Sequence, residues 1–310
     1  MTAPHSRNRA LGFLLALVTS VLWGTVPLAG KVALPGITAA TLSVLRLLLA
    51  GLCLALFLGC RGSTGLRRLL ARPPSLVYLA ALGLACNYVC YMLGLERAGA
   101  ATTQVLIQLA PLFLILLSVV WLGERPRPRQ MVGAALALTG LFVVSSASHG
   151  AGAHGGQLNT GMALVVFSAL TWGVYAAAHK RLGEEHTSGA TMMWIFLLAS
   201  LAIAPTIPLE AARRPDGVQA LAIAFLCLNT VVAYWSFAES LRHIEAWIVA
   251  VITTLGPVVT LGLVAISNRL GWERIGYEQL GPGKLAGAAL VLGGVVLAVA
   301  TRTVKDANTA

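Results

Sequence analysis

The fold is decided by QLAPLFLILLSVVWLGERPRPRQMVGAALALTG, residues Gln108–Gly140, because much of this pattern returns in Thr254–Gly294. Each copy has a polar residue shortly before a proline, then an apolar run, a Glu-Arg loop and a glycine-led segment. The segment GAALALTG at Gly133–Gly140 aligns with GAALVLGG at Gly287–Gly294. Self-similarity at a fixed offset indicates a repeated structural unit, so we predict two halves that share one plan.

A second anchor lies earlier in each half. A Trp-Gly pair, with a lysine eight residues after the tryptophan, occurs at Trp23 and again at Trp172. A glycine in a membrane helix lets a neighbouring helix approach closely, and a tryptophan can anchor at the bilayer interface or line a cavity. Because both tryptophans fall near the middle of apolar runs, we favour rings that line a cavity.

Composition assigns the chain to a lipid bilayer. Apolar residues make up 57% and charged residues 11%, and the mean hydropathy is +0.81; soluble proteins carry about 25% charged residues. The 22 Lys and Arg residues outnumber the 11 Asp and Glu residues, but they cluster between apolar runs, which is typical of membrane orientation. We therefore expect the protein to interact with the lipid bilayer and not with nucleic acid. Five cysteines without metal-ligand spacing indicate no metal and no cofactor.

A helix that crosses a bilayer needs about 20 mostly apolar residues. Ten segments meet this requirement: Ala10–Val32, Ala40–Cys60, Ser75–Leu95, Ala101–Leu122, Gln130–Ser148, Thr160–His179, Ala190–Leu209, Val218–Ala238, Trp247–Ser267 and Lys284–Thr301. The sequence therefore predicts an all-α integral membrane protein with ten transmembrane helices.

The ten spans divide into a first five-helix repeat over residues 10–148, a linker over 149–158 and a second five-helix repeat over 159–302. Since five is an odd number of crossings, the second repeat enters the membrane from the opposite side, and the two repeats are inverted. Lys and Arg concentrate on the side that holds the N-terminus, which places both termini in the cytoplasm and the chain in the cell (plasma or inner) membrane. Inverted repeats are typical of secondary transporters, which bind substrate near the bilayer midplane.

These residues resemble the drug/metabolite transporter superfamily, EamA-type. The resemblance rests on the two Trp-Gly pairs, on Arg46 with Ala50, on Pro111 followed by the loop Gly123–Arg125, and on the glycine-rich last helix of each half. It covers essentially Leu11–Thr301. It implies ten helices in two repeats, a central cavity, and transport, commonly export, of small organic metabolites such as amino acid-like solutes or drugs by alternating access.

Polar side chains inside the spans indicate the expected path, because they are costly in a bilayer unless they are paired or face water. Gln104, Gln108 and Pro111, for example, fall on one helical face. The candidate substrate-binding residues are Trp23, Asn87, Tyr91, Gln104, Gln108, Pro111, Trp172, Tyr175, Asn229, Tyr234, Thr254 and Pro257. For any one of them, a role in holding helices together is an equal alternative.

Arg46 is the charge that falls clearly inside a span. It can receive a substrate carboxylate, or it can snorkel to the interface or bond backbone carbonyls. The second half has no charge around the equivalent Ile195, so we favour the structural role. The expected cavity is then neutral and suits a zwitterionic or aromatic solute.

The sequence has no phosphate-binding loop, metal-ligand cluster or nucleophile–base pair at motif spacing. We therefore expect neither an enzyme nor an ATP-driven pump, and keep a membrane-embedded enzyme and a non-transporting membrane subunit as the alternatives to a transporter. The membrane potential, a proton gradient or the solute's own gradient can supply the energy, with Glu96 and Glu239 as candidate gate or proton residues. No feature indicates an oligomeric state.

Overall fold

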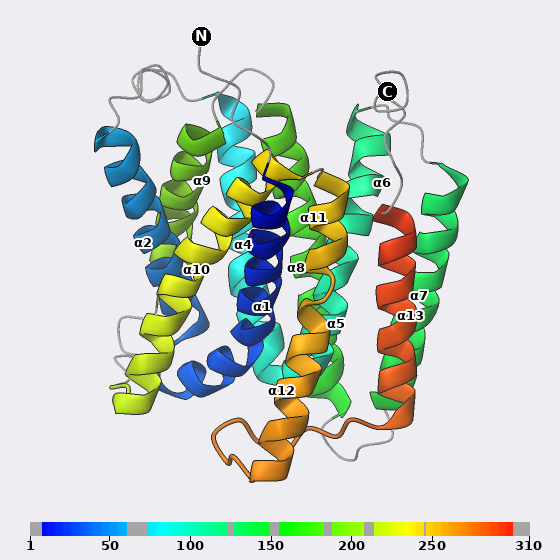
Figure 1. Cartoon of the computed structure of the whole chain (residues 1–310). Helices are drawn as coiled ribbons and strands as arrows, with labels where there is room; N and C mark the ends of the chain where they lie inside the picture. The colour runs from blue at the N-terminus through cyan, green and yellow to red at the C-terminus, as the bar shows by residue number, and fades with distance from the viewer. Residues whose placement is uncertain are drawn as a thin grey trace.

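A computed structural model of the chain describes residues 8–60, 74–122, 127–148, 155–182, 188–207, 214–244 and 246–299, and these residues form helices and connections without a strand (Figure 1). The α-helices are α1 (Arg9–Ala33), α2 (Ala39–Cys60), α4 (Ser75–Ala98), α5 (Ala100–Leu106), α6 (Ala110–Leu122), α7 (Pro128–Ser148), α8 (Gly155–Leu182), α9 (Ser188–Ile203), α10 (Gly217–His243), α11 (Ala246–Thr253), α12 (Gly256–Leu270) and α13 (Pro282–Val299). Short 3-10 turns are η1 (Leu34–Gly36), η2 (Ile107–Leu109) and η4 (Ala204–Thr206).

Seven of the described helical segments are long and apolar enough to cross a bilayer, and three shorter apolar helices accompany them. The shorter ones are Pro128–Val144, Gly256–Leu270 and Pro282–Ala298. The ten predicted spans fall on these ten segments, so the all-helical membrane fold is confirmed. The chain termini, the loop around residues 123–126 and the predicted linker up to residue 154 lie outside the described residues.

Two spans that the sequence predicts as continuous are interrupted. The fourth consists of α5, η2 and α6, and the ninth consists of α11 and α12 separated at Thr254 and Leu255. A proline follows each interruption closely, at Pro111 and at Pro257. Because proline has no N–H, the carbonyl four residues before it loses its helical donor, and the local turn tightens or breaks.

The main helix contacts join the two halves of the chain. Helix α4 packs along α8, α7 along α13, α1 along α10 and α2 along α9, and Figure 1 shows α7 beside α13 at one side of the bundle. In each pair one helix precedes residue 149 and the other follows residue 154. The buried core therefore lies between the halves, and neither half has a complete core alone.

The two glycine-led segments of the repeat pack on each other, α7 against α13. A Cβ at Gly294 would lie 2.5 Å from the carbonyl oxygen of Gly133 and 2.5 Å from the backbone nitrogen of Ala137. A Cβ at Gly287 would lie 2.9 Å from the carbonyl oxygen of Gly140. The absent side chains let the two backbones touch, which is how small residues join helices in lipid, where the hydrophobic effect contributes little to helix association.

The connection from Gly271 to Gly281 is held by two polar contacts at one end of the bundle. The carboxylate of Glu278 accepts from the backbone N–H of Ala101 at 3.0 Å and of Thr102 at 3.3 Å, at the start of α5. Arg274 donates to Asp216 at 2.8 Å; the backbone N–H of Gln219 and then this guanidinium hold the pKa of Asp216 below its usual value. An anion at a helix N-terminus is favourable, so Glu278 stabilises the start of the interrupted fourth span.

We expect Gly294→Ala to destabilise the protein, because the added methyl meets backbone atoms that cannot rotate away. Gly293→Ala is the matched control, since its Cβ has only Leu136 Cδ2 within contact range, at 4.0 Å. Melting of the purified proteins in detergent should show a loss of about 1–3 kcal/mol for position 294 and little change, or a gain of up to about 1 kcal/mol, for position 293. Equal melting temperatures for the two variants would contradict the backbone contact.

Candidate functional site

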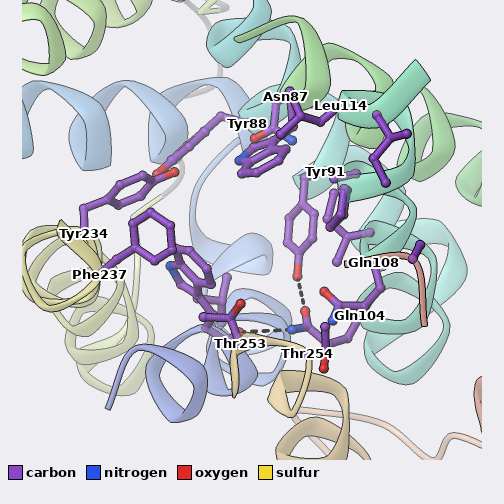
Figure 2. A pocket seen from close by; sticks show the side chains of 18 of the residues that line it. Asn87, Tyr88, Tyr91, Gln104, Gln108, Leu114, Tyr234, Phe237, Thr253 and Thr254 are labelled. Atoms are coloured by element: carbon purple, nitrogen blue, oxygen red, sulfur yellow. Dashed lines mark hydrogen bonds between the residues drawn. The ribbon is translucent and has the colours of Figure 1, made fainter. Parts of the chain in front are cut away.

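A cavity of about 640 Å³ occupies the middle of the bundle, within the range of about 300–1,000 Å³ for small-molecule sites. Nine of the twelve candidate residues line it: Trp23, Asn87, Tyr91, Gln104, Gln108, Pro111, Trp172, Tyr234 and Thr254. Figure 2 shows Tyr234 and Phe237 on one side of the hollow, facing Tyr91 and Gln108 on the other. The structure thus brings together groups from helices far apart in the sequence.

The other three candidates lie outside the cavity lining. The hydroxyl of Tyr175 donates to the sulfur of Met192 at 3.2 Å, within a buried cluster. The amide of Asn229 donates to the carbonyl oxygen of Leu22 at 2.8 Å, and Pro257 is buried in the first turn of α12. We therefore withdraw these three from the candidate site, because their packing assigns them to helix contacts.

Each Trp-Gly pair packs against the interrupted span of the other half. A Cβ at Gly24 of α1 would lie 2.7 Å from the carbonyl oxygen of Gly256, at the start of α12. A Cβ at Gly173 of α8 would lie 3.0 Å from Cβ of Phe113 in α6. The glycines let these helices approach, and the preceding Trp23 and Trp172 are part of the cavity wall.

Most polar groups on the wall already hold neighbouring helices together. The amide of Asn87 donates to the carbonyl oxygen of Ser168 at 3.0 Å and to its hydroxyl at 2.9 Å, joining α4 to α8. The hydroxyl of Tyr91 donates to Gln104 Oε1 at 2.9 Å, and Gln104 donates to the carbonyl oxygen of Trp23 at 3.5 Å (Figure 2). These bonds satisfy polar groups that would otherwise be costly in a bilayer.

Gln108 is different. It lies on η2, where the fourth span is interrupted, and its half-buried side chain lines the cavity (Figure 2). Within the described part of the chain its amide has no hydrogen-bond partner. An amide that is on a cavity wall and not used in packing is available to a bound solute.

Arg46 also lies on the cavity wall, and here the expected neutral cavity is wrong. Its side chain is 6% exposed, its Nε donates to the hydroxyl of Thr230 at 2.9 Å, and its guanidinium lies 4.8 Å from the centre of the Tyr88 ring. Among the described residues the side chain therefore donates to a hydroxyl and not to a carbonyl, and its burial argues against snorkelling to the interface. Whether Arg46 faces the cavity depends on how α2 is rotated against α4 and α10. The sequence of α2 alone does not determine that rotation.

Four residues that were not among the candidates also line the cavity: Thr230, Phe237, Arg127 and Gln130. The first two share one face of α10 with Tyr234, since positions 230, 234 and 237 follow the helical spacing. That spacing could have identified them. Arg127 and Gln130 belong to the start of α7, so the cavity extends from mid-bundle to that end.

Glu96 and Glu239, the candidate gate or proton residues, lie away from the cavity lining. Glu96 is exposed near the end of α4, and Glu239 lies 3.4 Å from His243 on α10. Within the described ranges, no three His, Cys, Asp or Glu residues come together in a way that could hold a metal ion. The chemistry that the lining offers is hydrogen bonding, aromatic contact and positive charge.

A model of the EamA-like transporter family matches residues 10–146 and again residues 159–300. An "uncharacterized inner membrane transporter YhbE" of Escherichia coli (strain K12) is 29% identical, with 82% of this chain and 80% of that protein covered. A "probable terminal-alkyne amino-acid exporter" of Streptantibioticus cattleyicolor is 29% identical, with 91% of each covered. A solved crystal structure, 22% identical, matches with a TM-score of 0.66 over 94% of this chain and 97% of that chain, which supports the fold.

Proposed function

Since the chain belongs to the EamA-like transporter family, we propose that it exports small organic metabolites, amino acid-like solutes among them, by alternating access. One observation carries the choice of site, namely the cavity between the two halves with the Gln108 amide on its wall, which has no hydrogen-bond partner among the described residues. The Streptantibioticus relative, named a probable terminal-alkyne amino-acid exporter, supports an amino acid as cargo. No catalytic reaction is part of the proposal.

The proposal includes two inverted repeats, residues 10–148 and 159–302, joined by a linker over 149–158. The helix contacts support it because they keep their pattern when the halves are exchanged: α1 with α10 corresponds to α8 with α4, and α1 with α12 corresponds to α8 with α6. The chain also runs from α5 to α6 in one direction and from α11 to α12 in the other (Figure 1). Inverted repeats let two equivalent arrangements alternate around one site.

We assign the end of the bundle at which α7 begins to the cytoplasm, with both chain termini on that side. The first turn of α1 and the last turn of α13 lie at this end (Figure 1), and so do Arg127, Arg129, Lys180 and Arg181 at helix ends. The positive-inside rule supports the assignment. The cavity lining includes Arg127 and Gln130 at this end, and the proposal therefore includes an inward-facing state.

A proton gradient is one energy source that the proposal includes. Glu239 and His243 lie on α10 beyond the cavity-lining Phe237, at the end where protons would enter from the cytoplasm. Release that depends on an imposed pH gradient, and loses that dependence in Glu239→Gln, would support proton coupling. If release depends only on the solute gradient, that gradient supplies the energy for transport.

The orientation predicts which cysteines an impermeant thiol reagent labels in intact cells. Tyr277→Cys, on a residue that is 80% exposed in the connection after α12, should be labelled, and Arg129→Cys, exposed in the first turn of α7, should not. Both are made with the five native cysteines replaced. Labelling of position 129 without position 277 would reverse the proposed topology.

We predict that Gln108→Leu loses transport while the protein still folds, because in the described part of the chain this amide has no structural partner to lose. Purified protein in liposomes loaded with the proteinogenic amino acids should release one or more of them faster than protein-free liposomes do. Gln108→Leu should slow this release about tenfold or more, equivalent to at least about 1.4 kcal/mol. The control is Leu116→Ala, at a residue of α6 that is 53% exposed. This variant should release amino acids at the wild-type rate.

Two results would argue against this function. If the wild-type protein releases no amino acid, the assigned cargo class is wrong. If Gln108→Leu releases at the wild-type rate, or only in proportion to a loss of folded protein, the cavity is not the path.

A further inference from the structure

The inference concerns Arg46 and rests on the proposed function. In the described part of the chain Arg46 has two partners, the Thr230 hydroxyl at Nε and the Tyr88 ring against the guanidinium. The hydroxyl of Thr230 in turn donates to the carbonyl oxygen of Leu226 at 3.0 Å, so its oxygen is oriented as an acceptor. The side chain is therefore fixed through Nε and one face, and within the described ranges its two terminal Nη groups have no protein acceptor.

Among the residues that the structure describes, the buried charge of Arg46 has no counter-ion. Position 46 is about 10 Å along α2 from its first residue, at 1.5 Å per residue, and no ion pair of Arg46 occurs among the described residues. The cavity lining carries Arg46 and Arg127 and, in the same described ranges, no aspartate or glutamate. A buried charge that lacks a partner is strongly unfavourable, whereas a glutamine could donate to Thr230 without this cost. A buried arginine that is held through Nε and one face has the geometry of an anion-binding site.

We propose that Arg46 binds the carboxylate of the transported solute through its terminal Nη groups. A planar fork of N–H donors matches a carboxylate in two parallel hydrogen bonds. A single cation at this depth balances a single negative charge. The rings of Trp23, Tyr234 and Phe237 lie in the same cavity and offer an apolar surface. The substrate class is therefore a monocarboxylate with an apolar or aromatic remainder, and the site discriminates against amines that lack the acid group.

Selectivity of the wild-type protein tests this without any variant. Liposomes that contain the protein are loaded with L-phenylalanine or L-phenylalaninamide, and with L-leucine or L-leucinamide; each pair differs only in the acid group. Protein-dependent release of the acids should exceed that of the amides about tenfold or more, the order of change that loss of one partner of a buried charge pair produces. 3-Phenylpropionate, which keeps the carboxylate and lacks the amine, should slow phenylalanine release when both are loaded.

Arg46→Gln separates substrate binding from a structural role. It keeps a donor for Thr230 and removes the charge, so release of the acids should fall much more than release of the amides, and the ratio of the two rates should approach one. Arg46→Lys keeps the charge and should retain the preference for the acids. Elution on size exclusion and the melting temperature report whether each variant folds, and if Arg46→Gln does not fold the wild-type comparison alone decides.

The inference is overturned if the wild-type protein releases amides as fast as acids, or if Arg46→Gln slows both in equal proportion, which is the result of a purely structural arginine. Either outcome leaves the exporter proposal standing, because amino acids are still released. A wild-type protein that releases none of the proteinogenic amino acids contradicts the cargo class of the proposed function itself, so the two failures are distinguishable.

Discussion

The structure depends on close backbone contact between a Trp-Gly helix of one half and the interrupted span of the other. At Gly24 the α1 backbone approaches the start of α12, and at Gly173 the α8 backbone approaches α6. In lipid, helices gain little from hiding apolar surface from each other, so contact through small residues is a main source of association. The same contact directs Trp23 and Trp172 into the cavity wall, so packing and site formation have one cause.

The interruptions in the fourth and ninth spans have a cost that the cavity explains. Backbone groups without a helical partner are unfavourable in hydrocarbon and are tolerated where protein or water satisfies them. Here the interruptions lie at the middle of the bundle, next to Gln104, Gln108 and Thr254 on the wall. An irregular backbone beside polar side chains is a feature of a substrate path and would be unusual in a purely structural helix bundle.

Much of the fold could be predicted from the sequence because its signals are local. Twenty-residue apolar runs identify helices whatever they pack against, and the ten predicted spans agree with the observed helical segments. The site was predicted less completely, because the side that a residue faces depends on how helices rotate against each other. Asn229 has the same amide as Gln108, yet its partner is the Leu22 carbonyl of α1, and Arg46 was expected outside the site although it lies on the wall.

One cavity holds an arginine without a counter-ion and an amide without a protein partner among the described residues, together with a set of aromatic rings. We propose that a carboxylate solute completes them. A cryo-electron microscopy structure of the purified protein with L-phenylalanine tests this most directly. The account predicts density for the solute in the cavity, with its carboxylate within hydrogen-bond distance of the Nη atoms of Arg46 and its ring against the aromatic wall. Phenylalanine bound at another place, with Arg46 still facing an empty cavity, would contradict it.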